Sequence, residues 1–132
     1  MQVLQPASWP RPRGYSHGIA AQGTVVFVAG QIGANPETGA IAPDFAGQLH
    51  QTLRNLITVL REAGAGPEHL ADMTWYVTDI AAYKAAGREI GDAWRETLGR
   101  NFPAITLVQV VALLDERALI EVSAHAVVPA ST

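Results

Sequence analysis

Cysteine is absent from the 132 residues, so the chain has no disulfide, no thiolate ligand for zinc and no cysteine nucleophile. We therefore expect a reducing compartment, the cytoplasm by default. Charged residues are also sparse, at 16%, and nine Lys and Arg stand against twelve Asp and Glu. The basic residues form no run, which argues against nucleic acid as a partner because a phosphate backbone needs clustered cations.

Long hydrophobic runs and targeting signals are missing as well. No apolar stretch approaches the roughly 20 residues that a membrane helix needs, so no membrane association is expected. The first residues lack a basic region followed by an apolar run, so we expect no signal peptide. The four histidines show no metal-ligand spacing and no Gly-rich phosphate loop occurs, so neither a metal nor a cofactor is expected.

Apolar side chains are plentiful, at 48% of the chain. The length fits a single domain over residues 1–132 that buries a sizeable core. Because so much of a small chain is apolar, part of its surface is expected to be covered by a second copy.

The periodicity of the apolar residues predicts an α+β fold with the order β-β-β-α-β-α-β-β. Asp44 is expected to cap the first helix and Gly64 to stop it. Two helices are expected over residues 44–63 and 81–98, and strands over 15–22, 24–31, 70–78, 104–111 and 119–128, with a short further strand in the N-terminal arm.

Each predicted helix has one apolar stripe, which favours one six-stranded sheet with both helices on one face. The other face is then uncovered, yet apolar side chains at alternating strand positions are expected on it: Val25, Phe27, Ile105, Leu107 and Val111. An apolar open face is unfavourable in a monomer, so we expect self-association through it.

The last strand carries the best candidate for chemistry. Its even positions are apolar, whereas its odd positions include Glu121, Ser123 and His125 on the opposite face. A partly desolvated carboxylate at Glu121 suits proton transfer near neutral pH. The alternative interpretation of Glu121 is an ion pair with an arginine across a subunit interface. His125, near the end of the strand, is expected to be a surface or interface histidine.

A series of short motifs runs along the chain from about residue 14 to 127. They are Gly14-Tyr15-Ser16, Val26-Phe-Val-Ala-Gly-Gln-Ile32, Asn35-Pro-Glu-Thr-Gly39, Gln48, Leu53-Arg-Asn-Leu56, Glu62-Ala-Gly-Ala65, Tyr76-Val-Thr-Asp79, Phe102-Pro-Ala104 and Leu119-Ile-Glu-Val122. In order and spacing, this series resembles the RidA/YjgF family of reactive-intermediate deaminases, also called L-PSP endoribonucleases.

The resemblance implies a chorismate-mutase-like trimer, in which three sheets form a central barrel and small-molecule substrates bind in clefts between subunits. It also implies an arginine after Phe-Pro-Ala that binds the substrate carboxylate, a glutamate in the last strand that activates water and a tyrosine that lines the cleft. Water then attacks the C=N bond of a 2-imino acid formed from its enamine, and ammonia leaves.

The tyrosine matches Tyr15 and the glutamate matches Glu121, but three family positions differ. Ile105 stands where the arginine is expected, Ala29 replaces a serine before Gly30, and Gly87 falls where the family has an asparagine. Losing the guanidinium costs about 2–5 kcal/mol of affinity for a carboxylate. These residues predict a roomier, more apolar cleft, with a substrate-binding set of Tyr15, Ala29, Gly30, Gly87, Ile105 and Leu107.

Two functions follow. The first is a divergent hydrolytic deaminase for a larger or less polar substrate than simple 2-imino acids, with Glu121 as catalytic residue. Arg13 or Arg88 is a candidate for the lost anchor. The alternative is a non-catalytic trimer that binds a small ligand or a partner. The composition does not support a ribonuclease, because neither a basic surface nor a suitable histidine pair is present.

Overall fold

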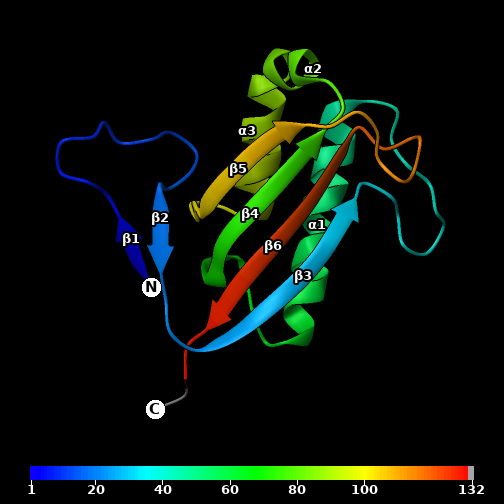
Figure 1. Cartoon of the computed structure of the whole chain (residues 1–132). Coiled ribbons are helices and arrows are strands. Elements are labelled where there is room, and N and C mark those ends of the chain that lie inside the picture. Colours follow the sequence, from blue (N-terminus) through cyan, green and yellow to red (C-terminus); the bar gives the residue numbers. More distant parts are fainter. Residues whose placement is uncertain (131–132) are drawn as a thin grey trace.

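The computed structural model describes residues 1–130 and confirms an α+β fold (Figure 1). The helices are α1 (Phe45–Glu62), α2 (Ile80–Ala85) and α3 (Gly87–Thr97), and a single 3-10 turn, η1 (Pro67–His69), precedes the fourth strand. The strands are β1 (Gln2–Leu4), β2 (Gly18–Ala20), β3 (Thr24–Ile32), β4 (Leu70–Val77), β5 (Ala104–Gln109) and β6 (Ile120–Val128).

The main sheet has four strands in the order β3-β6-β4-β5. β6 is antiparallel to both of its neighbours, whereas β4 and β5 run parallel and are joined through α2 and α3. The expectation of one six-stranded sheet is wrong, because β1 and β2 pair only with each other in a separate two-stranded ribbon. In Figure 1 this ribbon and its long loop stand beside the β5 side of the sheet.

The N-terminal arm explains this departure. Three prolines between residues 5 and 14 disfavour regular pairing, and strand β2 reaches only three residues instead of the expected 15–22. The arm is held at the β5 edge by Ser16, whose Oγ donates to the carbonyl of Phe102 at 2.5 Å and whose N–H donates to Pro103 at 3.0 Å. The arm thus meets the main sheet through a single bridge between Ser16 and Ala104 rather than through a full strand.

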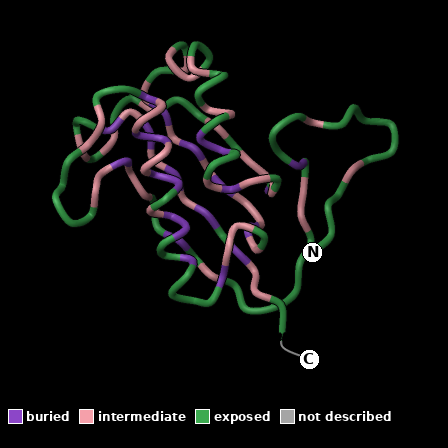
Figure 2. Tube along the Cα trace, turned by 180° about the vertical axis from the view of Figure 1, so that it is seen from behind, coloured by how far each residue is buried: buried purple, intermediate pink, exposed green. Residues whose placement is uncertain are grey.

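The three helices lie on one face of the main sheet, as predicted for a two-layer α+β fold (Figure 1). Buried segments concentrate between these two layers, whereas the N-terminal arm is largely exposed (Figure 2). Asp44 caps α1 by accepting from the N–H of Gly47, and Gly64 follows the helix at φ +68°, both as expected. The predicted stripe of α1 is buried: Phe45, Leu49, Leu53, Leu56 and Leu60.

The second predicted helix, over residues 81–98, is broken into two. Ala86 leaves the helical conformation at φ −96° and ψ 18°, and its N–H is shared between the carbonyls of Ala82 and Tyr83. Gly87 then begins α3. A glycine inside a helix weakens it by up to about 1 kcal/mol relative to alanine, which favours a break at this point.

The uncovered sheet face differs from the expected one at β5. Val25 and Phe27 lie exposed on β3 as predicted, and Val111 lies beyond the end of β5. Ile105 and Leu107 lie instead on the helical side, because β5 pairs with β4 in the register Ile105↔Met73 and Leu107↔Trp75 and both partners are buried. No helix within residues 1–130 is long and apolar enough to cross a membrane.

Candidate functional site

Glu121 lies on the open face of the sheet, near the start of β6, as the alternation of β6 predicts. The neighbouring positions Ile120 and Val122 are fully buried on the helical side. In the sheet register Glu121 stands between Tyr76 of β4 and Ile32 of β3. None of the ion pairs formed by residues 1–130 includes Glu121, so no cation of its own chain neutralises its carboxylate.

Gly30 makes room for that carboxylate. A Cβ added to Gly30 would lie 2.2 Å from Oε2 of Glu121 and 2.8 Å from its Cδ, both far too close for a real contact. The register of β3 against β6 shifts between Val28 and Gln31, so Ala29 and Gly30 form an irregularity in the ladder. The irregularity places Gly30 under the Glu121 side chain, whereas Ala29 is exposed beside it.

Gly30 and Glu121 line an open depression of about 770 Å³ together with the loop before β6. That loop contains Asp115 and Arg117, which are joined by two side-chain hydrogen bonds of 2.8 and 3.1 Å. Donation from the Arg117 side chain and backbone lowers the pKa of Asp115 to about 2. Arg117 is therefore engaged by Asp115, although it borders the same depression as Glu121.

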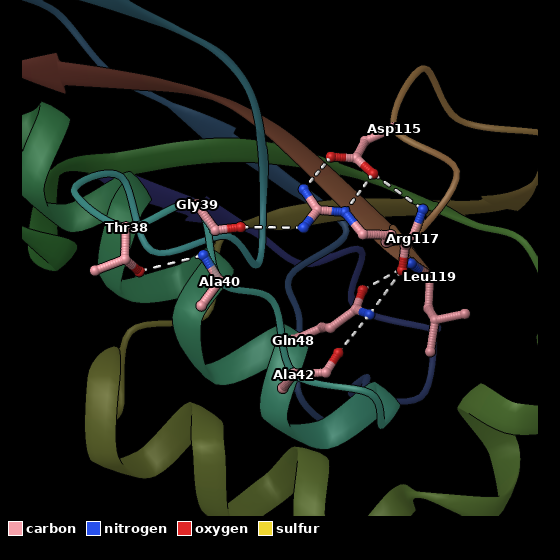
Figure 3. A network of polar contacts seen from close by, with 8 residues as sticks. All are labelled: Thr38, Gly39, Ala40, Ala42, Gln48, Asp115, Arg117 and Leu119. Carbon is pink, nitrogen blue, oxygen red and sulfur yellow. Dashed lines mark hydrogen bonds and ion pairs between the residues drawn. The ribbon is translucent and has the colours of Figure 1, made fainter.

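A buried glutamine holds this loop in place. Gln48 on α1 is 1% exposed, and its Nε2 donates to the carbonyls of Ala42 at 2.8 Å and Arg117 at 2.9 Å. Its Oε1 accepts from the N–H of Leu119 at 2.7 Å. Figure 3 shows Gln48 between these groups and Arg117 reaching the carbonyl of Gly39. All polar atoms of the Gln48 side chain thus fix the start of β6, two residues before Glu121.

A second hollow lies on the helical side of the sheet at the β5 edge. This cavity of about 670 Å³ contains four of the predicted site residues: Tyr15, Gly87, Ile105 and Leu107. Tyr15 reaches it because Ser16 ties the arm to the segment before β5. A Cβ on Gly87 would meet nothing within 4 Å, so this position leaves open space.

Aromatic rings form much of the wall of this β5-edge cavity. Trp94 stacks on Trp75 with centroids 6.1 Å apart and on Phe102 at 6.0 Å, the latter with an interplanar angle of 3°. Tyr83 meets Trp75 edge to face at 6.4 Å. Trp94, which belongs to the apolar stripe of the second predicted helix, therefore both packs in the core and borders the cavity.

Arginines border the same cavity. Arg13, Arg95 and Arg100 line it, whereas Arg88 is not among its lining residues. Of the two candidates for a replacement anchor, the structure thus places Arg13 at the cavity. Arg95 pairs with Asp92, but neither Arg13 nor Arg100 forms an ion pair within residues 1–130.

The predicted site is therefore divided within one chain. Tyr15, Gly87, Ile105 and Leu107 share the β5-edge cavity, and Gly30 and Glu121 share the depression at β6, while Ala29 borders neither. Within one chain Glu121 and Ile105 lie on opposite faces of the sheet, so the expectation that Ile105 lies on the open face is wrong. A crevice between copies that brings Glu121 of one copy opposite Ile105 of another stays a prediction. Their roles in binding and catalysis stay predictions.

His125 contacts Asp72 and Phe27 of its own chain and lines neither of the two hollows. Its Nδ1 lies 2.6 Å from Oδ1 of Asp72, and its ring meets Phe27 edge to face at 5.1 Å on the open sheet face. Among residues 1–130, no three or more His, Asp or Glu side chains gather closely enough to hold a metal ion.

Sequence reasoning missed several residues of both hollows. Trp75, Trp94 and Phe102 carry no local signal for a cavity, because apolar periodicity does not distinguish a core ring from a lining ring. Arg100 sits in a turn two residues before the Phe102-Pro-Ala104 motif and is not part of it. Gln48 does carry a signal: it is a polar residue beside Leu49 on the buried stripe of α1, and a buried amide needs specific partners.

Comparison with known proteins bears on this arrangement. The family model described as Endoribonuclease L-PSP matches residues 8–128. A RutC family protein of Synechocystis is 36% identical over 132 residues, covering 98% of each chain. A 2-iminobutanoate/2-iminopropanoate deaminase of Salmonella typhimurium is 31% identical over 105 residues, which cover 80% of each chain.

Solved structures agree with the fold. The Rid family protein YyfB of Yersinia pestis superposes with a TM-score of 0.84 at 28% identity, covering 96% of this chain and 98% of its own. TdcF of E. coli with bound serine gives a TM-score of 0.71 at 26% identity, with the same two coverages. From the matched family model and these relatives, the chain belongs to the RidA/YjgF family, also called the Endoribonuclease L-PSP family.

Proposed function

We propose that this protein is a divergent hydrolytic deaminase of the RidA family, which acts on an imine larger or less polar than simple 2-imino acids. Each chain is one RidA-type domain, and the working unit is a homotrimer with no cofactor. The main support for this proposal is the setting of Glu121. Its carboxylate forms no ion pair within residues 1–130 and lies against Gly30 in an open depression. The cytoplasmic location stays a prediction.

Assembly of three copies brings the two hollows together. In a ring of three copies each contact joins two different surfaces, and we propose that these are the β6 depression of one copy and the β5-edge cavity of the next. The uncovered sheet face supports self-association, because Phe27 is 75% exposed and Val25 is 48% exposed on it.

The chemistry follows from one carboxylate and one water molecule. Glu121 accepts a proton from water as the oxygen adds to the imine carbon and passes that proton to the nitrogen, which converts C=NH into the carbinolamine HO–C–NH2. Glu121 then transfers the hydroxyl proton to the nitrogen as the C–N bond breaks, so that ammonia leaves and a carbonyl group forms. The relative named as a 2-iminobutanoate/2-iminopropanoate deaminase supports this reaction class.

The proposed preference for a larger or less polar imine over simple 2-imino acids depends on Ile105. An arginine at this position would supply a bidentate partner for a carboxylate, whereas isoleucine supplies only apolar surface. The neighbouring wall consists of Leu107 and aromatic rings, which favours a bulky substrate over a small polar one.

Ammonia release from freshly generated imines tests the proposal. The wild type should release ammonia from imines of bulky or aromatic amino acids, and Glu121→Gln should lower the rate by about 100-fold or more. Equal rates for the two proteins would contradict the enzyme reading and favour a trimer that only binds a ligand or partner.

Ile105→Arg provides the complementary test of substrate choice. The variant should gain activity on the imines of alanine and 2-aminobutanoate relative to the wild type, because it restores a guanidinium. A wild type that already prefers these small imines would contradict the proposed role of Ile105.

A further inference from the structure

The β5-edge cavity combines two chemical features, of which a purely apolar substrate would use only one. Its wall is aromatic and aliphatic, with Trp94, Phe102 and Ile105 among the lining residues. Its border carries arginines, and no Asp or Glu is among its lining residues. A ligand that fills only the apolar part would leave this positive border unmatched.

Two of the border arginines are available to a ligand. Arg95 is engaged by Asp92, but Arg13 and Arg100 form no ion pair within residues 1–130 and both are exposed. They come from different segments, Arg13 from the N-terminal arm and Arg100 from the turn between α3 and β5. Two guanidinium groups on one border attract an anion, and a carboxylate matches their planar donor geometry.

The aromatic wall accepts a flat group. Phe102 stacks on Trp94 and keeps 42% of its own surface exposed, so it offers an open ring surface to a ligand. Gly87 also lines the cavity and leaves open space, since no atom lies within 4 Å of an added Cβ. A volume of about 670 Å³ falls within the usual range of small-molecule sites and holds a one- or two-ring ligand.

We propose that this cavity binds an aromatic carboxylic acid, with the ring against Phe102 and Ile105 and the carboxylate between Arg13 and Arg100. The inference rests on the proposed function in one respect, that the same cavity holds the substrate of the hydrolysis. It narrows the substrate class from larger or less polar imines in general to imines that carry both a ring and an acid group. The acid anchor moves from β5 to the arm and the α3–β5 turn.

Binding of stable probes tests this without any turnover. Indole-3-acetate and phenylacetate should bind the purified full-length protein, and their amides and plain acetate should bind at least about tenfold more weakly, by calorimetry at fixed ionic strength. The amides remove the charge and keep the ring, whereas acetate keeps the charge and removes the ring.

Arginine variants locate the anchor. Arg100→Gln and Arg13→Gln should each weaken indole-3-acetate binding several-fold, and the double variant about tenfold or more, with little change for the amide. Arg88→Gln is the matched control, because Arg88 lies at the start of α3 but does not line the cavity, and its affinity should equal that of the wild type.

Three results would overturn the inference: equal binding of acid and amide, unchanged binding by the double variant, or no binding of either aromatic acid. The outcomes separate it from the proposed function. If aromatic acids bind but ammonia release does not depend on Glu121, the proposed reaction is contradicted and the proposed ligand class is supported. Glu121-dependent release from small aliphatic imines without aromatic-acid binding would do the reverse.

Discussion

The Glu121 carboxylate occupies the space that a side chain on Gly30 would fill. A methyl group at Gly30 would lie 2.2 Å from Oε2 of Glu121, although the two residues come from strands whose nearest ends, Ile32 and Ile120, are 88 positions apart in the chain. The need for glycine at position 30 is thus explained by the nearby Glu121 carboxylate. Backbone conformation does not require it, since the φ of Gly30 is not positive.

Gly30→Ala should therefore disable the carboxylate and leave the fold nearly intact. The added methyl group forces the flexible Glu121 side chain to rotate, so we expect the rate of ammonia release to fall about tenfold or more, with a small loss of stability. In a Glu121→Gln background the same change should have no further effect, because the two residues act as a unit. Independent, multiplying losses in the double variant would contradict this coupling.

Gln48→Leu should be among the most destabilising single changes. It removes the partners of the Leu119 N–H and of the Ala42 and Arg117 carbonyls at a site that is 1% exposed. Each buried group left unpaired costs about 1–3 kcal/mol, so we expect a loss of at least about 2 kcal/mol in urea unfolding. Gln51→Leu is the matched control on the same helix, because Gln51 bonds only to the Asn55 side chain. Similar losses for both variants would contradict the role given to Gln48.

The ion pair in the loop before β6 gives a pH dependence with a defined sign. Hydrogen bonds from Arg117 lower the pKa of Asp115 from 3.8 to about 2, so the folded state favours the ionised carboxylate. Its contribution to stability is present above about pH 3.8 and is lost as the pH falls towards 2.

The measurement is the urea midpoint of the wild type against Asp115→Asn. The difference between the two proteins should be constant from pH 7 to about 5 and should shrink below about pH 4. Glu116→Gln is the control, because Glu116 forms no ion pair within residues 1–130. A difference that grows as the pH is lowered would have the wrong sign.

Ser16→Ala should loosen the arm without unfolding the sheet. The variant loses the bond from Ser16 Oγ to the Phe102 carbonyl but keeps the backbone bond to Pro103. We expect trypsin to cleave after Arg13 several-fold faster and aromatic acids to bind several-fold more weakly, because one neutral hydrogen bond contributes about 1 kcal/mol. Unchanged proteolysis would show that the arm is held by other contacts.

Local signals explain which parts of the fold could be predicted. The apolar stripe of α1, its Asp44 cap and the stop at Gly64 all depend on neighbours within a few residues, and all are confirmed. The alternation of β6 is equally local, and it placed Glu121 on the open face correctly.

The failures depend on long-range pairing. In β5, Ile105 and Leu107 alternate with Thr106 and Val108, so both faces carry apolar groups and only the register with β4 decides which face is inside. The separate β1–β2 ribbon likewise depends on the arm meeting residues 102 and 103, about 85 positions away, which no local pattern encodes.

The same difference between local and long-range signals applies to the candidate site, whose residue roles stay predictions. The resemblance to the family supplied Tyr15, Gly30 and Glu121 from motifs, and the structure placed each of them at a hollow. The aromatic wall and Arg100 come from segments whose proximity arises only on folding.

Mixed oligomers test the central claim that one site is built from two copies. Glu121→Gln damages the β6 depression, and Ile105→Trp fills the β5-edge cavity, so each variant alone should release almost no ammonia. Unfolded together in equal amounts and refolded, they should regain roughly one quarter of the wild-type rate, because one site in four then combines an intact Glu121 with an intact neighbouring cavity. A mixture that stays as inactive as its two components, although mass spectrometry shows mixed trimers, would contradict the shared site.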